Sequence, residues 1–251
     1  MSDPLFHRQP YKAALVTGGA KRIGAVIVRH LASRGMKVVL HYQHSAEEAE
    51  ALVEELKRKK IEIIALQADL TKSHEAKNLI KDATKALGQP IDCLINNASL
   101  FEKDSLDDCE DDLFDRHYAI HVKAPAYLAQ AMLKQLPEGR KGLIVNMIDQ
   151  KILKLNPHFF TYTLSKAALG TLTKTAAQAL APYIRVNGIA PGPTLASKHQ
   201  DEEAFEAEAE KATLLGHSVD VDDITRALDF LMASQSVTGQ ILALDSGQHL
   251  A

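Results

Sequence analysis

The sequence predicts a single α/β domain in which helices cover both faces of a doubly wound, seven-stranded parallel sheet. Short apolar runs alternate with longer segments of helical length and period along the chain. The runs are apolar nearly throughout, as expected for strands of a parallel sheet that is buried on both faces. The chain has 251 residues, of which 46% are hydrophobic, enough for one large core. Repeated strand–helix order implies right-handed crossovers.

The expected strands and helices alternate over most of the chain. Strands are expected at Lys12–Thr17, Lys37–Tyr42, Ile61–Gln67, Ile91–Asn96, Gly142–Ile148, Ile184–Ile189 and Gln240–Leu244. Helices are expected at Ile23–Arg34, Ala46–Lys59, Lys72–Leu87, Asp111–Gln135, Phe160–Leu180 and Val221–Ala233.

The longest interruption of this rhythm runs from Pro191 to about Asp220 and contains the acidic segment Asp201–Glu206. Long excursions in compact domains are usually lids or binding loops. We therefore expect one reductase domain over residues 1–251 with a mobile substrate loop around residues 191–220. The alternative is a solvated surface helix without a role.

Composition and charge exclude several classes of function. A net charge of -3 gives no electrostatic case for binding nucleic acid or an anionic membrane. No apolar run approaches the roughly 18 residues of a membrane span, and none precedes the first strand. The two cysteines and eleven histidines show no metal-binding motif. We therefore expect a cytoplasmic protein with a small-molecule substrate and no metal site.

Tyr162 and Lys166 lie four residues apart within an expected helix, so their side chains share one face. Asp149 lies thirteen positions before the tyrosine. A free phenol has a pKa of about 10, and a nearby cation lowers it. The pair therefore has the chemistry of a proton donor and its tuning group. The same spacing also occurs on ordinary solvated helix faces.

A glycine-rich turn, Thr17–Gly24 with the sequence TGGAKRIG, follows the first expected strand and leads into a helix. Glycines permit close backbone approach, and the helix N-terminus offers unpaired N–H groups to a pyrophosphate. The spacing is not a plain GxGxxG, because Arg22 replaces a glycine. The turn predicts a dinucleotide site, with an ordinary glycine turn as the alternative.

The end of the second expected strand indicates which dinucleotide binds. An acid there would bind a ribose 2′-hydroxyl and repel a 2′-phosphate. This chain has His41–Ser45, HYQHS, and its next acid is Glu47. Lys21 and Arg22 are expected nearby. We therefore expect NADP(H) rather than NAD(H).

These motifs together resemble the short-chain dehydrogenase/reductase family over nearly the whole chain. The resemblance also includes Asp69 after the third strand, Asn96-Asn97-Ala98 after the fourth and Pro191-Gly192 after the sixth. It implies a Rossmann-type fold, with Tyr162 as proton donor and Lys166 on the nicotinamide ribose.

The resemblance also implies a cofactor site and an assembly. Asp69 would hold the adenine, and Asn96 and Ala98 would lie along the cofactor. Family members are commonly tetramers built on the fifth and sixth helices, so we expect a homotetramer. The implied cofactor-binding set is Gly18, Lys21, Arg22, Ile23, Gly24, His41, Tyr42, His44, Ser45, Asp69, Leu70, Asn97, Ala98, Ser99, Tyr162, Lys166, Pro191 and Gly192.

Three departures from the common family pattern resemble the pteridine reductases and the related dihydromonapterin and dihydrofolate reductases. Asp149 stands where the family has a serine, Ser99 follows Asn-Asn-Ala in place of glycine, and the glycine turn is changed. Phe101 matches an aromatic residue that would stack a pterin on the nicotinamide, or it could cap the core. The resemblance implies catalytic Tyr162, Lys166 and Asp149, and a substrate site of Ser99, Phe101, Asp149 and Tyr162.

Asp149 favours a heterocycle over a simple ketone. A carboxylate would repel a carbonyl oxygen but suits N–H donors such as the 2-amino-4-oxo edge of a pterin. We therefore expect an NADPH-dependent reductase of pterins or folates. Three alternatives stay open: Asp149 only caps a neighbouring element, the protein is a generic carbonyl or 3-oxoacyl reductase, or it is a catalytically weak NADP-binding regulator.

His121 stands four residues before Pro125, where the family usually has an asparagine that holds a water in a proton relay. An imidazole can pass protons because it titrates near neutral pH. The substitution could equally mean that the relay has been abandoned, and the sequence leaves both possibilities open.

Overall fold

Seven parallel strands form one sheet in the order β3-β2-β1-β4-β5-β6-β7. The computed structural model describes residues 11–196 and 201–251. The strands are β1 (Ala13–Val16), β2 (Lys37–Tyr42), β3 (Ile63–Gln67), β4 (Cys93–Asn96), β5 (Gly142–Met147), β6 (Ile184–Pro191) and β7 (Ile241–Leu244). The strand order reverses between β1 and β4, and ligands of such sheets bind at the carboxyl ends beside this switch point.

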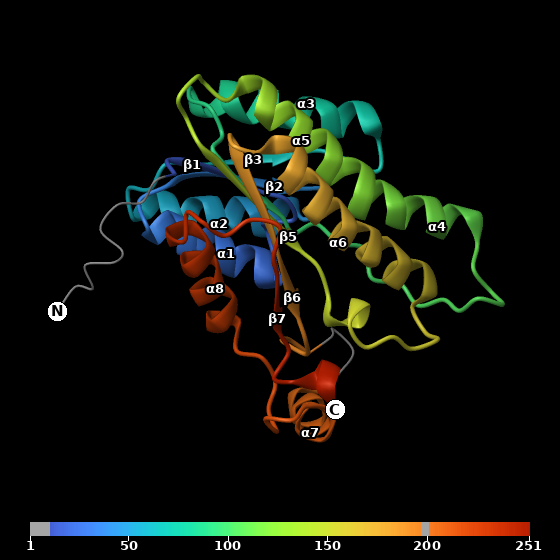
Figure 1. Ribbon diagram of the computed structural model, residues 1–251. Helices are drawn as coiled ribbons and strands as arrows, with labels where there is room; N and C mark the ends of the chain where they lie inside the picture. The colour runs from blue at the N-terminus through green and yellow to red at the C-terminus, as the bar shows by residue number, and fades with distance from the viewer. Residues whose placement is uncertain (1–10, 197–200) are drawn as a thin grey trace.

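Helices cover both faces of the sheet (Figure 1). On one face α1 (Arg22–Ser33), α2 (Ala46–Arg58) and α8 (Val221–Ala233) bury their apolar sides in one core cluster. On the other face α3 (Ser73–Leu87), α5 (Ala124–Gln135) and α6 (Phe160–Leu180) share a second cluster. Every residue of β1, β4 and β5 is buried, as expected for strands covered on both sides. The predicted doubly wound architecture is confirmed.

The helix expected at Asp111–Gln135 changes its geometry in the middle. It consists of α4 (Asp111–Tyr118), a π-helical segment at Ala119–Lys123, and α5. A π segment has one residue more per hydrogen-bonded turn than an α-helix, and such segments are frequent at functional sites. The segment contains His121 and lies against α6.

The expected excursion after β6 contains a docked helix, α7 (Glu202–Ala212), which lies beside the C-terminus in Figure 1. Phe205 and Ala209 of α7 are buried, so this helix is packed rather than fully solvated. The Val219 N–H donates to the Pro193 carbonyl at 2.7 Å and ties the two ends of the excursion together. Residues 197–200 of the expected substrate loop lie outside the described part of the chain.

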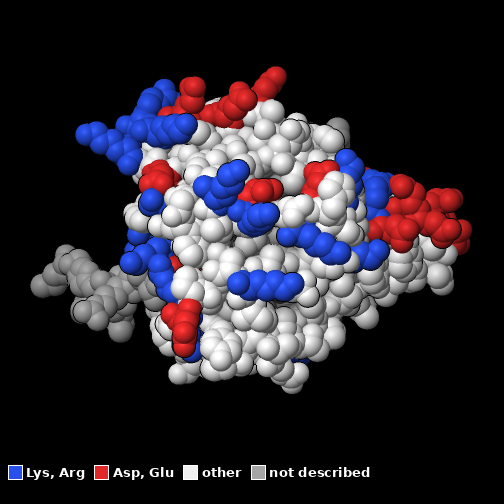
Figure 2. Space-filling model, turned by 90° about the horizontal axis from the view of Figure 1, so that it is seen from above, with Lys and Arg blue, Asp and Glu red and all other residues white. Residues whose placement is uncertain are grey.

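Surface charge is dispersed over the face that carries α3, α5 and α6. Figure 2 shows Lys and Arg side chains scattered among uncharged residues over the middle of this face, a group of basic side chains beside acids at its upper edge, and further acids gathered at the edge near α4. This face therefore offers no continuous basic surface to nucleic acid. Among the described residues, no helix combines the length and the apolar character needed to cross a membrane.

Candidate active site and cofactor pocket

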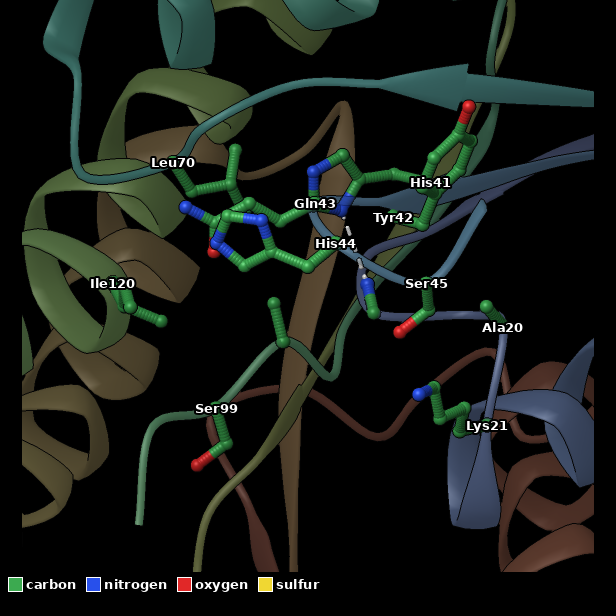
Figure 3. A pocket seen from close by; sticks show the side chains of 12 residues that line it. Ala20, Lys21, His41, Tyr42, Gln43, His44, Ser45, Leu70, Ser99 and Ile120 are labelled. Carbon is green, nitrogen blue, oxygen red and sulfur yellow. Dashed lines mark hydrogen bonds between the residues drawn. The ribbon is translucent and has the colours of Figure 1, made fainter. Parts of the chain in front are cut away.

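A pocket opens at the carboxyl ends of the strands, beside the switch in strand order (Figure 3). Its walls come from the glycine turn after β1, the end of β2, and the segments that follow β3 and β4. The lining residues are Gly18, Ala20, Lys21, His41, Tyr42, Gln43, His44, Ser45, Leu70, Ala98, Ser99 and Ile120. The pocket thus brings together many of the residues that the sequence assigns to the cofactor.

Two glycines let the turn approach neighbouring backbone closely. Gly18 has φ +61°, and a Cβ there would lie 2.9 Å from the Ala98 Cα. A Cβ on Gly24 would lie 2.1 Å from the Gly18 carbonyl oxygen. The Asn97 side-chain amide donates to the carbonyls of Thr17 and Gly18 at 2.9 and 3.0 Å. The shape of the turn therefore depends on glycine and on Asn97.

His41 links the glycine turn to the segment after β3 through hydrogen bonds at its two ring nitrogens. Its Nδ1 accepts a hydrogen bond from the Gly18 N–H at 3.1 Å, and its Nε2 donates to the Ala68 carbonyl at 3.0 Å. Burial is the main cause that lowers the pKa of His41 below its ordinary value, so the ring is neutral. His41 thus holds backbone in place, while His44 and Lys21 are the basic side chains that line the pocket (Figure 3).

Lys21 and Arg22 point to different places. The Lys21 Nζ lies 2.5 Å from a carboxylate oxygen of Glu48, in the first turn of α2. The Arg22 guanidinium donates to the carbonyls of Leu195 and Ala196 at 3.1 and 2.8 Å. The sequence predicts both cations near the 2′-phosphate, but Arg22 contacts the segment after β6 instead.

Asp149 meets both Tyr162 and the backbone. The Tyr162 hydroxyl donates to Asp149 Oδ2 at 2.7 Å. Asp149 Oδ1 accepts from the Lys151 N–H at 2.8 Å and caps the short 3₁₀-helix Gln150–Ile152. The capping role and the contact with the tyrosine therefore coexist, one on each carboxylate oxygen.

Lys166 does not act on Tyr162 as expected. Its Nζ donates to the Met147 carbonyl at 2.8 Å and lies 5.6 Å from the centroid of the Tyr162 ring. Burial raises the pKa of Tyr162 well above its ordinary value, and the Asp149 carboxylate raises it further. The expectation that Lys166 lowers this pKa was wrong, because burial and the carboxylate dominate. Burial also lowers the pKa of Lys166, to about 8.

Phe101 lies at the mouth of the site rather than in the core, with 55% of its surface exposed. Its ring stacks on Phe159 with centroids 4.3 Å apart and 10° between the planes, and meets Tyr162 edge-on at 4.8 Å. The Lys151 Nζ lies 4.8 Å from the other ring, that of Phe159. Sequence reasoning missed Phe159. The sequence could have pointed to Phe159 only through its position three residues before Tyr162. Its left-handed backbone conformation, with φ +56°, has no sequence signature.

Of the remaining expected residues, Asp69 and Asn96 hydrogen-bond neighbouring protein groups, and the others lie at the ends of strands and helices or line the pocket. Asp69 lies after β3, where its carboxylate accepts from the N–H and hydroxyl of Thr71. Asn96 is buried and donates to Asn146 at 2.8 Å, so it joins two strands. Ile23 and Gly24 lie in the first turn of α1, Ser45 precedes α2, and Leu70 and Ala98 line the pocket. Pro191 ends β6, and Gly192 follows it beside Asp245.

Sequence reasoning also missed a cluster of buried polar side chains next to Tyr162. The Thr161 hydroxyl makes a short hydrogen bond to the Asp104 carboxylate, so its oxygen accepts from His117 Nδ1 at 2.8 Å. The rings of His117 and His121 are stacked 5.7 Å apart, and both meet Tyr162 edge-on. His117 lies in the last turn of α4 and His121 in the π-helical segment, and the sequence does not reveal the change of helix geometry between them.

Several known proteins are similar to this chain in fold and sequence. The model of the short chain dehydrogenase family matches residues 12–208. A crystal structure of FolM alternative dihydrofolate reductase 1 from Brucella canis, complexed with NADP, is 46% identical with a TM-score of 0.92, and the match covers 97% of this chain and 96% of that one. A short chain dehydrogenase from Burkholderia cenocepacia in complex with NADP is 31% identical with a TM-score of 0.88, covering 97% and 100%. The 3-oxoacyl-[acyl-carrier-protein] reductase FabG from Staphylococcus epidermidis is 32% identical over 244 residues, which are 95% of this chain and 99% of that protein.

Proposed function

The chain belongs to the short-chain dehydrogenase family, and we propose that within this family it is an NADPH-dependent reductase of a pterin- or folate-like heterocycle. It is an oxidoreductase that uses NADP(H). The observation that carries the choice of substrate is the hydrogen bond between Tyr162 and the Asp149 carboxylate. The 46% identity to a protein named as an alternative dihydrofolate reductase supports the same choice.

The pocket residues fit NADP(H). The close backbone approach at Gly18 and Gly24, at the N-terminus of α1, suits a pyrophosphate. Lys21 and His44 line the pocket at the end of β2, where a 2′-phosphate would be bound. Lys166, fully buried, would hold the nicotinamide ribose. The cofactor, when bound, supplies the hydride.

Tyr162 carries the proton in this proposal. Its raised pKa, caused by burial and then by Asp149, keeps the phenol protonated at neutral pH. The hydroxyl turns from the carboxylate to a ring nitrogen of the substrate and donates its proton there. Asp149 is only partly buried, so it can collect a proton from solvent and return it to the phenolate along the same hydrogen bond.

Asp149 and Phe101 select the substrate. A carboxylate oxygen binds N–H donors and repels a carbonyl oxygen, which favours an amino-substituted ring over a ketone. The exposed ring of Phe101, 4.8 Å from Tyr162, offers a flat surface on which an aromatic heterocycle can stack.

A generic 3-oxoacyl reductase is the second candidate, because FabG from Staphylococcus epidermidis is 32% identical over 95% of this chain. The test is an NADPH-oxidation assay with dihydropterin, dihydrofolate, quinonoid pterin and a 3-oxoacyl thioester. We expect turnover with a dihydropterin or dihydrofolate. Turnover with the thioester alone would support the second candidate, and tight NADPH binding without any turnover would indicate a regulatory protein.

We also propose that the protein is a homotetramer of single reductase domains that pack through α5 and α6. Leu133 on α5 and Leu164 on α6 are each 37% exposed, and much of this face is uncharged (Figure 2). Light scattering after size-exclusion chromatography tests the assembly. A monomeric mass at micromolar concentration would exclude it.

A further inference from the structure

His121 is a buried junction beneath the proposed proton donor. Only 1% of its surface is exposed, and its ring meets Tyr162 edge-on at 5.4 Å. Its Nε2 lies 3.0 Å from the Ser99 hydroxyl and 3.3 Å from the Leu100 nitrogen. Its Nδ1 lies 2.7 Å from the Ser165 hydroxyl. Both ring nitrogens are therefore fully engaged.

The backbone fixes where the imidazole carries its proton. The Leu100 N–H donates to Nε2, so this nitrogen is unprotonated in the neutral ring. The ring proton is then on Nδ1 and is donated to the Ser165 hydroxyl. Ser165 in turn donates to the Tyr162 carbonyl at 2.7 Å. Every donor has one acceptor, so the hydrogen bonds run in a single direction.

This chain of hydrogen bonds cannot carry protons to solvent. It ends at a backbone carbonyl, which has no proton to pass on. Protonation of the ring is also unfavourable: burial, then the Lys166 charge from α6 and then His117 from α4, hold the pKa of His121 well below its ordinary value. Of the two possibilities for His121, these contacts favour an abandoned relay.

The same geometry decides how Ser99 faces the cleft. With Nε2 unprotonated, Ser99 is the donor in the contact at 3.0 Å. The hydroxyl proton is directed to His121 at 3.0 Å, with the Leu100 carbonyl as a longer alternative acceptor at 3.5 Å. Ser99 itself is exposed at the cleft, and its oxygen points away from the segment His41–Ser45 (Figure 3). What remains for a ligand is the oxygen lone pairs, which accept hydrogen bonds.

We propose that His121 is a positioning residue that holds Ser99 as a hydrogen-bond acceptor, so that Ser99 and Asp149 together select a substrate with two N–H donors. The proposal rests on the proposed pterin or folate reductase activity. It also permits one reorientation: after Tyr162 gives up its proton, Ser99 can turn its hydroxyl to the phenolate while the Leu100 N–H still occupies Nε2.

Two substitutions of His121 test the roles of its two ring nitrogens separately. Glutamine can place an amide oxygen near the position of Nε2, and asparagine can place an amide nitrogen near that of Nδ1. We expect His121→Gln to keep kcat, KM and the pH profile with dihydropterin within about threefold. His121→Asn should raise KM roughly tenfold, the loss typical of one or more buried hydrogen bonds. Ser99→Ala should lose as much, and the double variant Ser99→Ala/His121→Asn no more than either.

The kinetic outcome that would overturn the proposal is a fall in kcat in both His121 variants with one ionisation removed from the pH profile, since that result belongs to a relay. Additive losses in the double variant would equally contradict it. Thermal unfolding of each variant with NADP⁺ present shows whether the fold is kept, and His117→Asn is the matched control on the same helical face.

A second measurement does not depend on turnover. Imidazole ¹⁵N NMR of the protein with NADP⁺ identifies the His121 ring by its absence in His121→Asn. We expect a neutral ring protonated at Nδ1 that does not titrate between pH 6 and pH 9. A titrating ring, or one protonated at Nε2, would refute the proposal. If the ring behaves as expected but no pterin is reduced, the proposed function fails and the positioning of Ser99 stands.

Discussion

Asp149 links two functions at the scale of single atoms, because one carboxylate oxygen caps Gln150–Ile152 and the other accepts from Tyr162. Asp149→Ser keeps a side chain that caps helices well but removes the charge. We expect kcat/KM for dihydropterin to fall roughly 10- to 100-fold, the loss of a charge-assisted hydrogen bond, with no fall for the 3-oxoacyl thioester. Asp149→Asn is the shape-matched control. An unchanged substrate profile would mean that the acid does not contact the substrate.

Tyr162 can be tested without disturbing its packing. Tyr162→Phe keeps the ring that meets Phe101 and His121 and deletes only the hydroxyl. General acid catalysis contributes about 10² to 10⁴ in rate, so we expect a loss of that order in kcat. The Kd of NADPH, measured by fluorescence titration, should change less than twofold. Full activity in this variant would remove Tyr162 from the mechanism.

We expect the ion pair of Lys21 with Glu48 to influence the preference for NADPH. Their 2.5 Å ion pair places a carboxylate beside the cation that would meet the 2′-phosphate. Lys21→Met should weaken NADPH binding roughly tenfold, through loss of a charge-assisted contact, and leave NADH binding unchanged. Glu48→Gln should strengthen NADPH binding a few-fold because a competing charge is removed. Equal affinity of the wild-type protein for both cofactors would contradict the assignment.

At the scale of elements, Arg22 joins the start of α1 to the segment after β6, because its guanidinium donates to the carbonyls of Leu195 and Ala196. In Arg22→Met these carbonyls lose their partner, and we expect amide hydrogen exchange in α7 to quicken roughly fivefold, about 1 kcal/mol of local stability. Arg29→Met, on the same helix, is the control. Unchanged exchange together with weaker NADPH binding would instead place Arg22 at the cofactor, as the sequence predicts.

Strand and helix positions were predictable where a periodic pattern determines them. β2 and α6 match their expected bounds, since each is a long apolar or amphipathic run with clear ends. β3 begins at Ile63 rather than Ile61, because boundaries are set by pairing with β2. The π-helical segment at Ala119–Lys123 could not be predicted, because the extra residue has no sequence signature.

The candidate site was predictable only as far as spacing along one element allows. Tyr162 and Lys166 share a helix, so their proximity follows from the chain. The partners of His121 come from three separate segments, and their contacts depend on the π segment. Phe159, which stacks on Phe101, has a left-handed backbone conformation. Such contacts come from tertiary packing rather than from any local pattern.

At the scale of the whole molecule, the buried charge in the active site lowers the free energy of unfolding. Two apolar clusters, one on each face of the sheet, form most of the core, yet the cation of Lys166 is buried beneath the active site. Its charge is stabilised by a hydrogen bond to the Met147 carbonyl and by the charge of Asp149. Burial lowers the pKa of Lys166 from 10.5 to about 8, so the folded state releases this proton more readily than the unfolded state. Folding therefore carries an electrostatic cost at neutral pH.

That cost has a defined pH window. Below pH 8 both states hold the proton and the full cost applies, about 3 kcal/mol for this shift in pKa. Between pH 8 and 10.5 the unfolded state binds more protons, so this group makes the protein more stable as pH rises. Lys166→Met removes the charge and loses one hydrogen bond, worth about 1 kcal/mol. The variant should then be inactive but about 2 kcal/mol more stable at pH 7.

The free energy of unfolding in urea, without cofactor, should therefore differ between wild type and Lys166→Met by about 2 kcal/mol at pH 7 and by almost nothing at pH 9.5. Removing Lys166 also changes the charge near His117 and His121, but burial is the largest cause that lowers the pKa of both rings and it is present in both proteins. The change in this difference between pH 7 and pH 9.5 therefore reports mainly on Lys166. Lys174→Met, at an exposed position of the same helix, should show no pH-dependent difference. If the difference in free energy of unfolding between the two proteins were the same at pH 7 and pH 9.5, the buried amine would have an ordinary pKa. The electrostatic cost of the active site would then have to come from other groups.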